Sequence, residues 1–268
     1  MNPLLNRVVD ASGGLDLWSR TSTITADVSV GGPIWAVKGW SDAALRDLTV
    51  TVDIGRQHTV ITPFTTPHRS VAFDNTRNTA LDGVSATGAP ERVVLRDTAG
   101  EIVQERTDPR AAFAGVPRSA PWDALQLGYF LGYALWNYFT APALLLRPDV
   151  RTREIEPWRE AGRTWRRLRV RFPATLATHS LEQTFYYDAD GLQRRMDYVN
   201  GVCQREDDRL GDVVRCADTA RGVLLRQTRE ISASVRAGLG GVQITVDPVR
   251  NDMLPRFQLQ ALSVQQDF

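Results

Sequence analysis

Three segments in the first quarter of the chain alternate β-branched and polar residues with a period of two. They are Thr23–Val30, Leu48–Ile54 and Gln57–Thr62. This period turns successive side chains to opposite faces of a strand, so each segment is predicted to be a half-buried β-strand. Together they indicate an antiparallel meander. A short amphipathic helix is predicted before them over Pro3–Ser12, ended by Gly13-Gly14.

Two further pairs of segments have the pattern of β-hairpins. Arg92–Asp97 and Glu101–Arg106 flank a Thr-Ala-Gly turn, and Glu182–Tyr187 and Leu192–Val199 flank Asp188-Ala189-Asp190-Gly191. Asp and Gly supply the hydrogen bonds and positive φ that tight turns require. The polar stretch Asp74–Pro90 is predicted to be a loop.

The clearest strand pattern is Thr164–Phe172, where leucine, valine and phenylalanine face one side and three arginines face the other. After Asn200 the pattern is less regular. Five short candidate strands remain there: Val213–Val214, Val223–Leu225, Ile231–Val235, Val242–Val246 and Phe257–Val264.

The most informative segment is Ala124–Leu146, which contains no formal charge: ALQLGYFLGYALWNYFTAPALLL. Ser119, Pro121 and Asp123 suit a helix start, and Pro142 is expected to end or kink the helix near Ala141. We predict a helix over Trp122–Thr140. Its aromatic face carries five residues with polar tips or hydroxyls that we select as candidate ligand contacts: Trp122, Tyr129, Tyr133, Trp136 and Thr140.

A helix that is apolar on all sides is buried in protein or in a membrane. Its length and the pair Gly128 and Gly132 would suit a membrane. Gln126, Asn137 and the proline argue against it, as do the many strands that need a partner for their apolar faces. Two alternatives remain: a packed core helix held by a curved sheet, or a helix whose aromatic face lines a cavity for an apolar molecule.

Composition limits the classes of function. The chain has 268 residues, 43% hydrophobic and 24% charged, which is close to the globular average and compatible with a single domain over residues 1–268. A net charge of +1 does not suggest a nucleic-acid partner. The N-terminal residues lack the pattern of a signal peptide, so a cytoplasmic location is expected.

Candidate chemistry is sparse. The motifs of P-loop, dinucleotide-binding, zincin and hydrolase-elbow proteins are absent from the sequence. The three histidines, His58, His68 and His179, are far apart, and Asp188 with Asp190 is better explained as turn chemistry. Cys203 and Cys216 are too few for a thiol zinc site. We expect no cofactor and no metal, while an enzyme assembled from dispersed residues stays open.

Four stretches carry a resemblance to known proteins: ERTDPRAAFAG, WDALQLGYFLGYALWNYFTAPALLL, WRRLRVRFPATLATHS and FYYDADGLQRRMDY. They resemble an actinobacterial-type group of uncharacterised proteins, and the order of features resembles LolA-like lipoprotein carriers. The resemblance covers about Leu15 to Tyr198 and implies an unclosed β-barrel with a hydrophobic concavity for acyl chains. The sequence lacks a lipobox, and its strands after Tyr198 depart from that pattern.

These observations predict an α+β, mainly β protein, in which one strongly curved antiparallel sheet, an unclosed barrel, wraps around the long apolar helix. The function predicted first is binding of an apolar small molecule or lipid between sheet and helix. The alternatives are an enzyme acting on such a ligand and a structural or interaction protein.

Overall fold

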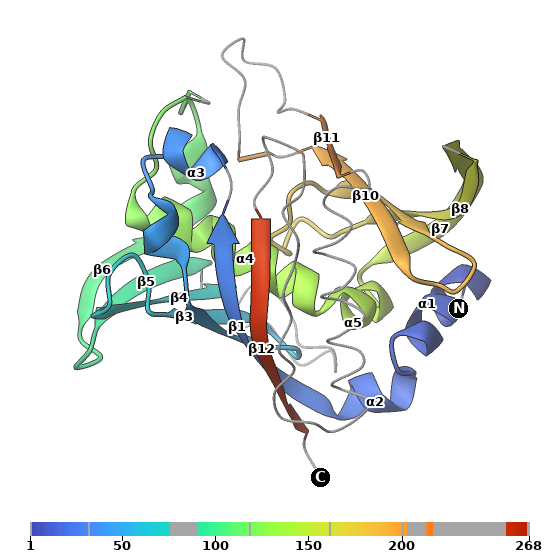
Figure 1. Ribbon diagram of the computed structural model, residues 1–268, viewed down its shortest axis with the longest axis horizontal. Coiled ribbons are helices and arrows are strands. Elements are labelled where there is room, and N and C mark those ends of the chain that lie inside the picture. The colour runs from blue at the N-terminus through green and yellow to red at the C-terminus, as the bar shows by residue number, and fades with distance from the viewer. Residues whose placement is uncertain are drawn as a thin grey trace.

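The computed structural model describes residues 2–31, 33–75, 90–117, 119–160, 162–199, 201–202, 213–216 and 256–266. In this part of the chain the strands form two antiparallel sheets, with an apolar helix near the centre (Figure 1). The sheets do not join into a closed barrel.

The first sheet has seven strands in the order β12-β1-β2-β3-β4-β5-β6. They are β1 (Thr21–Gly31), β2 (Leu48–Asp53), β3 (Gln57–Thr62), β4 (Arg69–Asn75), β5 (Arg92–Asp97), β6 (Ile102–Thr107) and β12 (Arg256–Gln266). From β1 to β6 each strand pairs with the next, and β12 returns to pair with β1. Every second residue of β2 and β3 is buried, as their sequence period requires.

The second sheet has five strands in the order β11-β10-β9-β8-β7. They are β7 (Arg151–Glu160), β8 (Arg163–Arg171), β9 (Glu182–Tyr187), β10 (Gln193–Val199) and β11 (Val213–Cys216). In the β9–β10 turn, Asp188 Oδ1 accepts hydrogen bonds from the backbone N–H groups of Asp190 and Leu192, and Gly191 has a φ of +82°. The sequence reading of this turn is therefore confirmed.

The helices are α1 (Pro3–Ala11), α2 (Leu15–Arg20), α3 (Pro33–Val37), α4 (Ala124–Phe139) and α5 (Ala141–Leu146), with 3₁₀ turns η1 (Asp42–Leu45) and η2 (Pro109–Phe113). A capping box starts α4: Asp123 accepts from the backbone of Gln126, whose side chain accepts from the backbone of Asp123. The helix ends at Phe139, and Pro142 lies in the first turn of α5. The predicted stop near Ala141 is thus confirmed.

Helix α4 is buried on all sides, since every residue from Leu125 to Phe139 is buried. Its closest strand neighbours are β3, β4 and β5. A Cβ atom on Gly132 would lie 2.5 Å from Phe73 Cβ, and one on Gly128 would lie 2.6 Å from Val71 Cγ2. The two glycines therefore let the first sheet approach the helix backbone, which explains the G-x-x-x-G pair without a membrane.

Two strands were not predicted. Residues Arg69–Asn75 form β4, so the predicted loop was wrong at Asp74 and Asn75, which belong to this strand. Residues Arg151–Glu160 form β7 despite Pro157, because β7 is an edge strand with an irregular register between Ile155 and Trp158. The prediction of one curved sheet also needs correction, since the chain leaves the first sheet after β6 and builds a second one after α5.

The end of the chain is described in two pieces. The candidates at Val213–Val214 and Phe257–Val264 lie in β11 and β12. Those at Val223–Leu225, Ile231–Val235 and Val242–Val246 lie outside the described residues.

Candidate functional site

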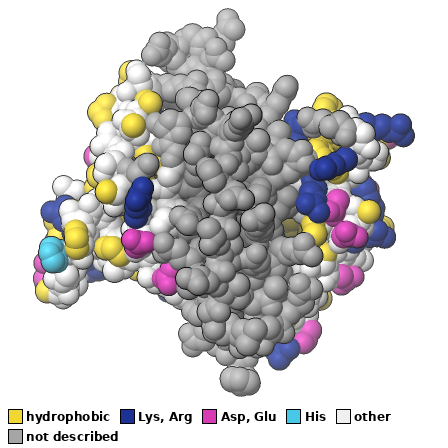
Figure 2. Space-filling view, viewed as in Figure 1, with side chains coloured by type: hydrophobic (Ala, Val, Ile, Leu, Met, Phe, Trp, Pro, Cys, Tyr) yellow, Lys and Arg dark blue, Asp and Glu magenta, His cyan; other side chains and the backbone are white. Residues whose placement is uncertain are grey.

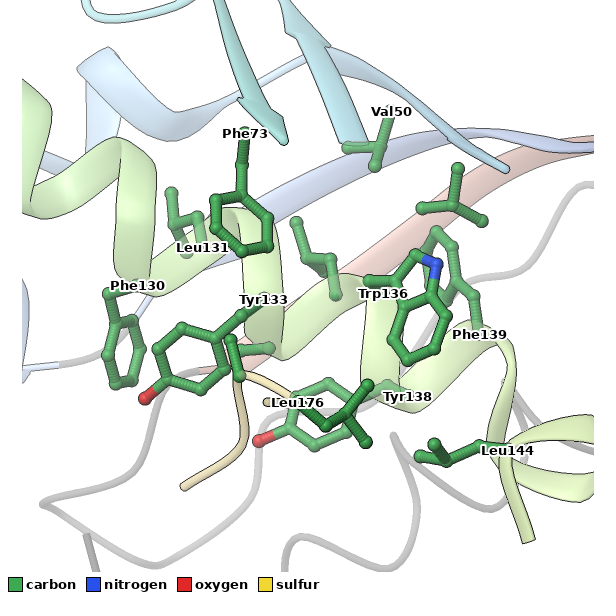
Figure 3. Packing of buried hydrophobic residues seen from close by; sticks show 14 of the residues in the cluster. Val50, Phe73, Phe130, Leu131, Tyr133, Trp136, Tyr138, Phe139, Leu144 and Leu176 are labelled. Atoms are coloured by element: carbon green, nitrogen blue, oxygen red, sulfur yellow. The ribbon is translucent and has the colours of Figure 1, made fainter. Parts of the chain in front are cut away.

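A group of polar side chains is buried on the side of α4 that faces the second sheet. His179, in the connection between β8 and β9, has its ring Nδ1 3.1 Å from the Tyr133 hydroxyl and its Nε2 2.8 Å from the Tyr138 hydroxyl. The Tyr198 ring of β10 stacks on the imidazole at 4.3 Å between centroids. Figure 3 shows both tyrosine hydroxyls pointing away from Phe73 and Val50, which lie on the first-sheet side. Helix and second sheet are thus joined through one histidine.

The imidazole of His179 is neutral at physiological pH. Its complete burial, with Arg110 nearby, lowers the pKa of His179 to about 3. A neutral imidazole has one donor nitrogen and one acceptor nitrogen, so one tyrosine donates to the ring and the other accepts from it. With both nitrogens engaged and a low pKa, His179 is a poor general base at neutral pH.

Arg110 extends this group toward the start of α4. From η2 it donates to the Tyr129 hydroxyl at 3.3 Å and to the Thr178 carbonyl at 3.1 Å. Burial raises the pKa of the Tyr129 hydroxyl, which therefore stays protonated. Because Thr178 precedes His179, the arginine helps to hold the segment that carries the histidine.

A small pocket lies beside His179, between α4–α5 and the second sheet. Its cavity volume is about 20 Å³, room for about one water-sized group. The described residues that line it are Asn137, Tyr138, Ala141, Leu144, Phe172, His179, Gln183, Phe185, Gln193 and Met196. Half of them are apolar, and since His179 is neutral none carries a charge at neutral pH.

Asn137 lines the pocket with an amide group whose two ends differ in their hydrogen bonding. Its Nδ2 donates to the Ala177 carbonyl at 3.2 Å, which fixes the orientation of the amide. Its Oδ1 is buried and has no hydrogen-bond partner among the residues that the structure describes, although the residue is 8% exposed. A buried acceptor without a donor costs free energy, so this oxygen favours a bound group that donates a hydrogen bond.

None of the five residues selected from the sequence lines this pocket. All five are buried: Trp122, Tyr129, Tyr133, Trp136 and Thr140. Their role as ligand contacts stays a prediction. The structure does bring Tyr129 and Tyr133 into the polar group around His179, with their rings 5.1 Å apart.

The other three are held by different parts of the molecule. Trp136 Nε1 donates to the carbonyls of Asp53 and Arg56, at the turn between β2 and β3, at 2.6 and 3.0 Å. Thr140 Oγ1 donates to the Trp136 carbonyl at 2.7 Å. Trp122 packs on Phe113 with 5.2 Å between ring centroids.

Sequence reasoning missed the pocket residues Asn137, Tyr138 and His179. Tyr138 is not among the five residues selected from the sequence, and His179 enters the sequence analysis only as one of three histidines that lie far apart. The sequence did contain one indication of this site. Asn137 and the Tyr138 hydroxyl are among the few polar groups of an otherwise apolar helix, and buried polar groups need hydrogen-bond partners.

The remaining candidates do not form a second site. His58 Nδ1 lies 3.8 Å from Asp74 Oδ2, and burial lowers the pKa of His58. His68 is exposed. Within the described residues no group of three metal-ligating side chains is present, and no helix is long and apolar enough to span a bilayer. Cys203 lies outside those residues, and Cys216 lies in β11.

No family model and no curated protein matches this chain. Among solved structures, a DUF1329 family protein from Desulfovibrio piger is similar with a TM-score of 0.35 and 11% identity, over 78% of this chain and 77% of its own. A LolA superfamily protein from Nitrosomonas europaea has a TM-score of 0.30 and 8% identity, over 98% and 90%. The Mycobacterium tuberculosis lipoprotein LppX has a TM-score of 0.22 and 10% identity, over 75% and 91%. All three scores lie below 0.5, so fold and function are argued from this chain's own geometry.

Proposed function

We propose that this protein binds an apolar small molecule or lipid between α4–α5 and the second sheet. The observation that carries the proposal is the pocket beside His179, which is lined by five apolar side chains and by Asn137, whose buried Oδ1 has no hydrogen-bond partner among the described residues. Binding would rest on burial of apolar surface, at about 0.8 kcal/mol for each methylene group, with few polar contacts to orient the molecule.

The small cavity limits how such a ligand is held. At about 20 Å³ it takes the polar end of a molecule, and an acyl chain needs further space between helix and sheet. The first sheet approaches α4 closely at Gly128 and Gly132, whereas side chains fill the space toward the second sheet. The added space therefore comes from side-chain movement on the second-sheet side.

The chemistry of the pocket favours an uncharged polar end. Asn137 Oδ1 accepts a hydrogen bond, and among the described lining residues no cation is present to pair with a carboxylate. An unpaired buried carboxylate would be costly. A hydroxyl or amide group on an apolar chain is the ligand class that fits.

The wider architecture is part of the same proposal. Two open antiparallel sheets around a buried helix agree with a LolA-like half-barrel. One continuous cluster of buried residues takes side chains from both sheets and from α4, which supports one domain over residues 1–268. For the enzyme alternative, the described lining residues offer only His179 as a general base, and its pKa is lowered to about 3.

Native mass spectrometry of protein purified without detergent, followed by organic extraction, tests the function. Gln193 is half-buried on β10 and lines the pocket, so Gln193→Trp should fill it and remove a co-purified molecule. Thr184, between Gln183 and Phe185 on β9, faces the opposite side, so Thr184→Trp adds the same side chain without filling the pocket. The wild type and Thr184→Trp should keep the molecule.

Three results would contradict the proposal. If the wild type had the mass of the ligand-free protein even after exposure to 1-decanol, the proposed binding function would be wrong. If Gln193→Trp and Thr184→Trp retained the co-purified molecule equally, the pocket would not be its binding site. Loss of the molecule in Trp136→Ala, with retention in Gln193→Trp, would move the site to the predicted aromatic face.

A further inference from the structure

The outer face of the second sheet carries four arginines that have no partner among the described residues. Arg151 pairs in register with Arg171, and Arg153 with Arg169, across the antiparallel β7–β8 hairpin. All four side chains are exposed, and none makes an ion pair or hydrogen bond with the described part of the protein. Residues directly opposite each other on adjacent strands have Cβ atoms about 5 Å apart. Two like-charged pairs therefore lie side by side on one face.

These arginines cannot be explained as intramolecular stabilisation. Like charges opposite each other across two strands lower stability. Elsewhere in the same sheet arginines are paired: Arg166 Nε lies 2.6 Å from Glu154 Oε1, and Arg195 Nε lies 2.7 Å from Asp197 Oδ1. Within the described part of the chain these four arginines have no acidic partner, so their charges can attract an anionic one.

The charge of this face is strongly positive even with its acidic residues included. Glu182 is in register with Arg171 and is exposed, while Asp197 is in register with Thr184 and is paired with Arg195. In Figure 2 basic side chains gather on the right-hand side of the molecule, where Figure 1 places β7, β8 and β10, with some acidic side chains among them. The face attracts anions more than a chain with a net charge of +1 would suggest.

An aromatic side chain lies on the same hairpin. Trp158 of β7 is 38% exposed, and the guanidinium groups of Arg167 and Arg195 lie 5.5 and 5.4 Å from its ring centroid. Tryptophan beside arginine is typical of the interface between water and lipid headgroups, where the ring is half in an apolar medium. The opposite face of this sheet contributes Gln183, Phe185, Gln193 and Met196 to the pocket, and Phe172 follows directly after β8.

We infer that the outer face of β7–β8 docks on the surface of an anionic lipid bilayer. Lipid phosphates neutralise Arg151, Arg153, Arg169 and Arg171, and Trp158 inserts among the headgroups. This inference depends on these five side chains alone and does not depend on whether the pocket binds a ligand. If the pocket also binds an apolar molecule, the docked sheet brings it next to a membrane that supplies or receives that molecule.

Co-sedimentation of the full chain with vesicles tests this inference. Vesicles of phosphatidylcholine with a quarter phosphatidylglycerol should bind the protein, and pure phosphatidylcholine vesicles should bind it much less. Arg153→Gln/Arg169→Gln should weaken binding by about 30-fold at low salt, given the usual contribution of each basic residue near an anionic surface. For both proteins, 0.5 M NaCl should release most of the charge-dependent part.

Arg20→Gln/Arg46→Gln is the control, because it removes two exposed arginines beside the first sheet, of which Arg20 is paired with Asp16. It should bind vesicles like the wild type. Trp158→Ala should lower the binding that persists at high salt. Equal binding to neutral and anionic vesicles, or equal loss in both double variants, would overturn the inference. So would salt-sensitive capture of duplex DNA through Arg153 and Arg169 without vesicle binding, which would assign the face to a nucleic acid.

These outcomes are separate from those of the ligand experiment. Vesicle binding uses residues on the outer face, and retention of a co-purified molecule uses Gln193 on the inner face. A negative result in either experiment therefore does not contradict the proposal tested by the other.

Discussion

The two sides of helix α4 are packed by different means. Toward the first sheet, Gly128 and Gly132 let Val71 and Phe73 approach the helix backbone until no space is left for another side chain. Toward the second sheet, Tyr133 and Tyr138 reach out to His179, and a pocket remains beside them. Figure 3 shows this division, with Phe73 and the tyrosine hydroxyls on opposite sides.

This difference shows how one apolar helix serves two purposes. Close contact of small and branched apolar groups makes a tight and inflexible interface. Long side chains with polar tips hold their partner at a distance and leave room between them. A ligand is therefore expected on the second-sheet side of α4.

The largest loss of stability should come from removing the hydrogen bonds of His179 on the second-sheet side of α4. His179→Phe leaves the ring volume nearly unchanged but removes a hydrogen-bond partner from each of two buried tyrosine hydroxyls, so we expect a loss of about 3 kcal/mol in the free energy of unfolding. Urea denaturation measures it. His68→Phe, at an exposed position, should change stability by less than about 0.5 kcal/mol. A His179→Phe protein as stable as the wild type would show that the imidazole bonds do not hold the sheet to the helix.

A single added methyl group should disturb the packing of α4 on the first sheet. Gly132→Ala would place a Cβ atom 2.5 Å from Phe73 Cβ, and we expect a loss of about 2 kcal/mol despite the better helix propensity of alanine. Gly31→Ala on β1 is the control, because nothing lies within 4 Å of the added atom. If both variants unfold at the same urea concentration as the wild type, α4 does not pack on β4 as described.

Acid should weaken the second-sheet side through His179. Its folded pKa of about 3 lies below the ordinary value of 6.5, so the unfolded chain binds the proton more readily between these values. Stability is complete above pH 6.5 and falls as the pH decreases toward 3, by up to about 1.4 kcal/mol per pH unit. Burial lowers the pKa of His58 as well, so both histidines act in the same direction.

The variant His179→Phe separates the contribution of His179 to the pH dependence of stability from that of His58. The variant should lose less stability than the wild type between pH 7 and pH 5, in urea denaturation at each pH. Identical pH slopes for the two proteins would mean that His179 is not buried in the neutral form.

The smallest effect concerns the polar end of the ligand. At pH 7 we expect 1-decanol to bind more tightly than decanoate, because Asn137 Oδ1 accepts a hydrogen bond and the described lining offers no cation. Asn137→Leu should weaken 1-decanol binding by about fivefold, or about 1 kcal/mol, and leave decanoate little changed. Tighter binding of decanoate by the wild type, in isothermal titration, would contradict the assignment of the polar end.

Short strands rich in β-branched or aromatic residues could be read from the sequence. Gln57–Thr62, Arg92–Asp97 and Glu182–Tyr187 have the same bounds in the sequence reading and in the structure. Strand β7 could not, because it contains Pro157 and mostly exposed residues, so its pattern does not reflect burial on one face. The division into two sheets depends on long-range pairing, which no local pattern records.

The candidate site could be predicted only in part. The unusual helix was evident from its lack of charge, and two selected residues, Tyr129 and Tyr133, belong to the polar group around His179. The side of the helix on which space remains depends on Gly128, Gly132 and the approach of β4. That information lies in tertiary packing, so the sequence favoured the aromatic face without showing what covers it.

The most direct test of the central claim is an NMR measurement of intermolecular nuclear Overhauser effects between 1-decanol and the methyl groups of the protein. Leu144 and Met196 line the pocket, while Val71 and Val93 lie against Gly128 on the first-sheet side. We predict contacts from 1-decanol to the methyl groups of Leu144 and Met196 and none to those of Val71 and Val93. Contacts to Val71 and Val93, or no contacts to any of the four, would contradict a binding site between α4 and the second sheet.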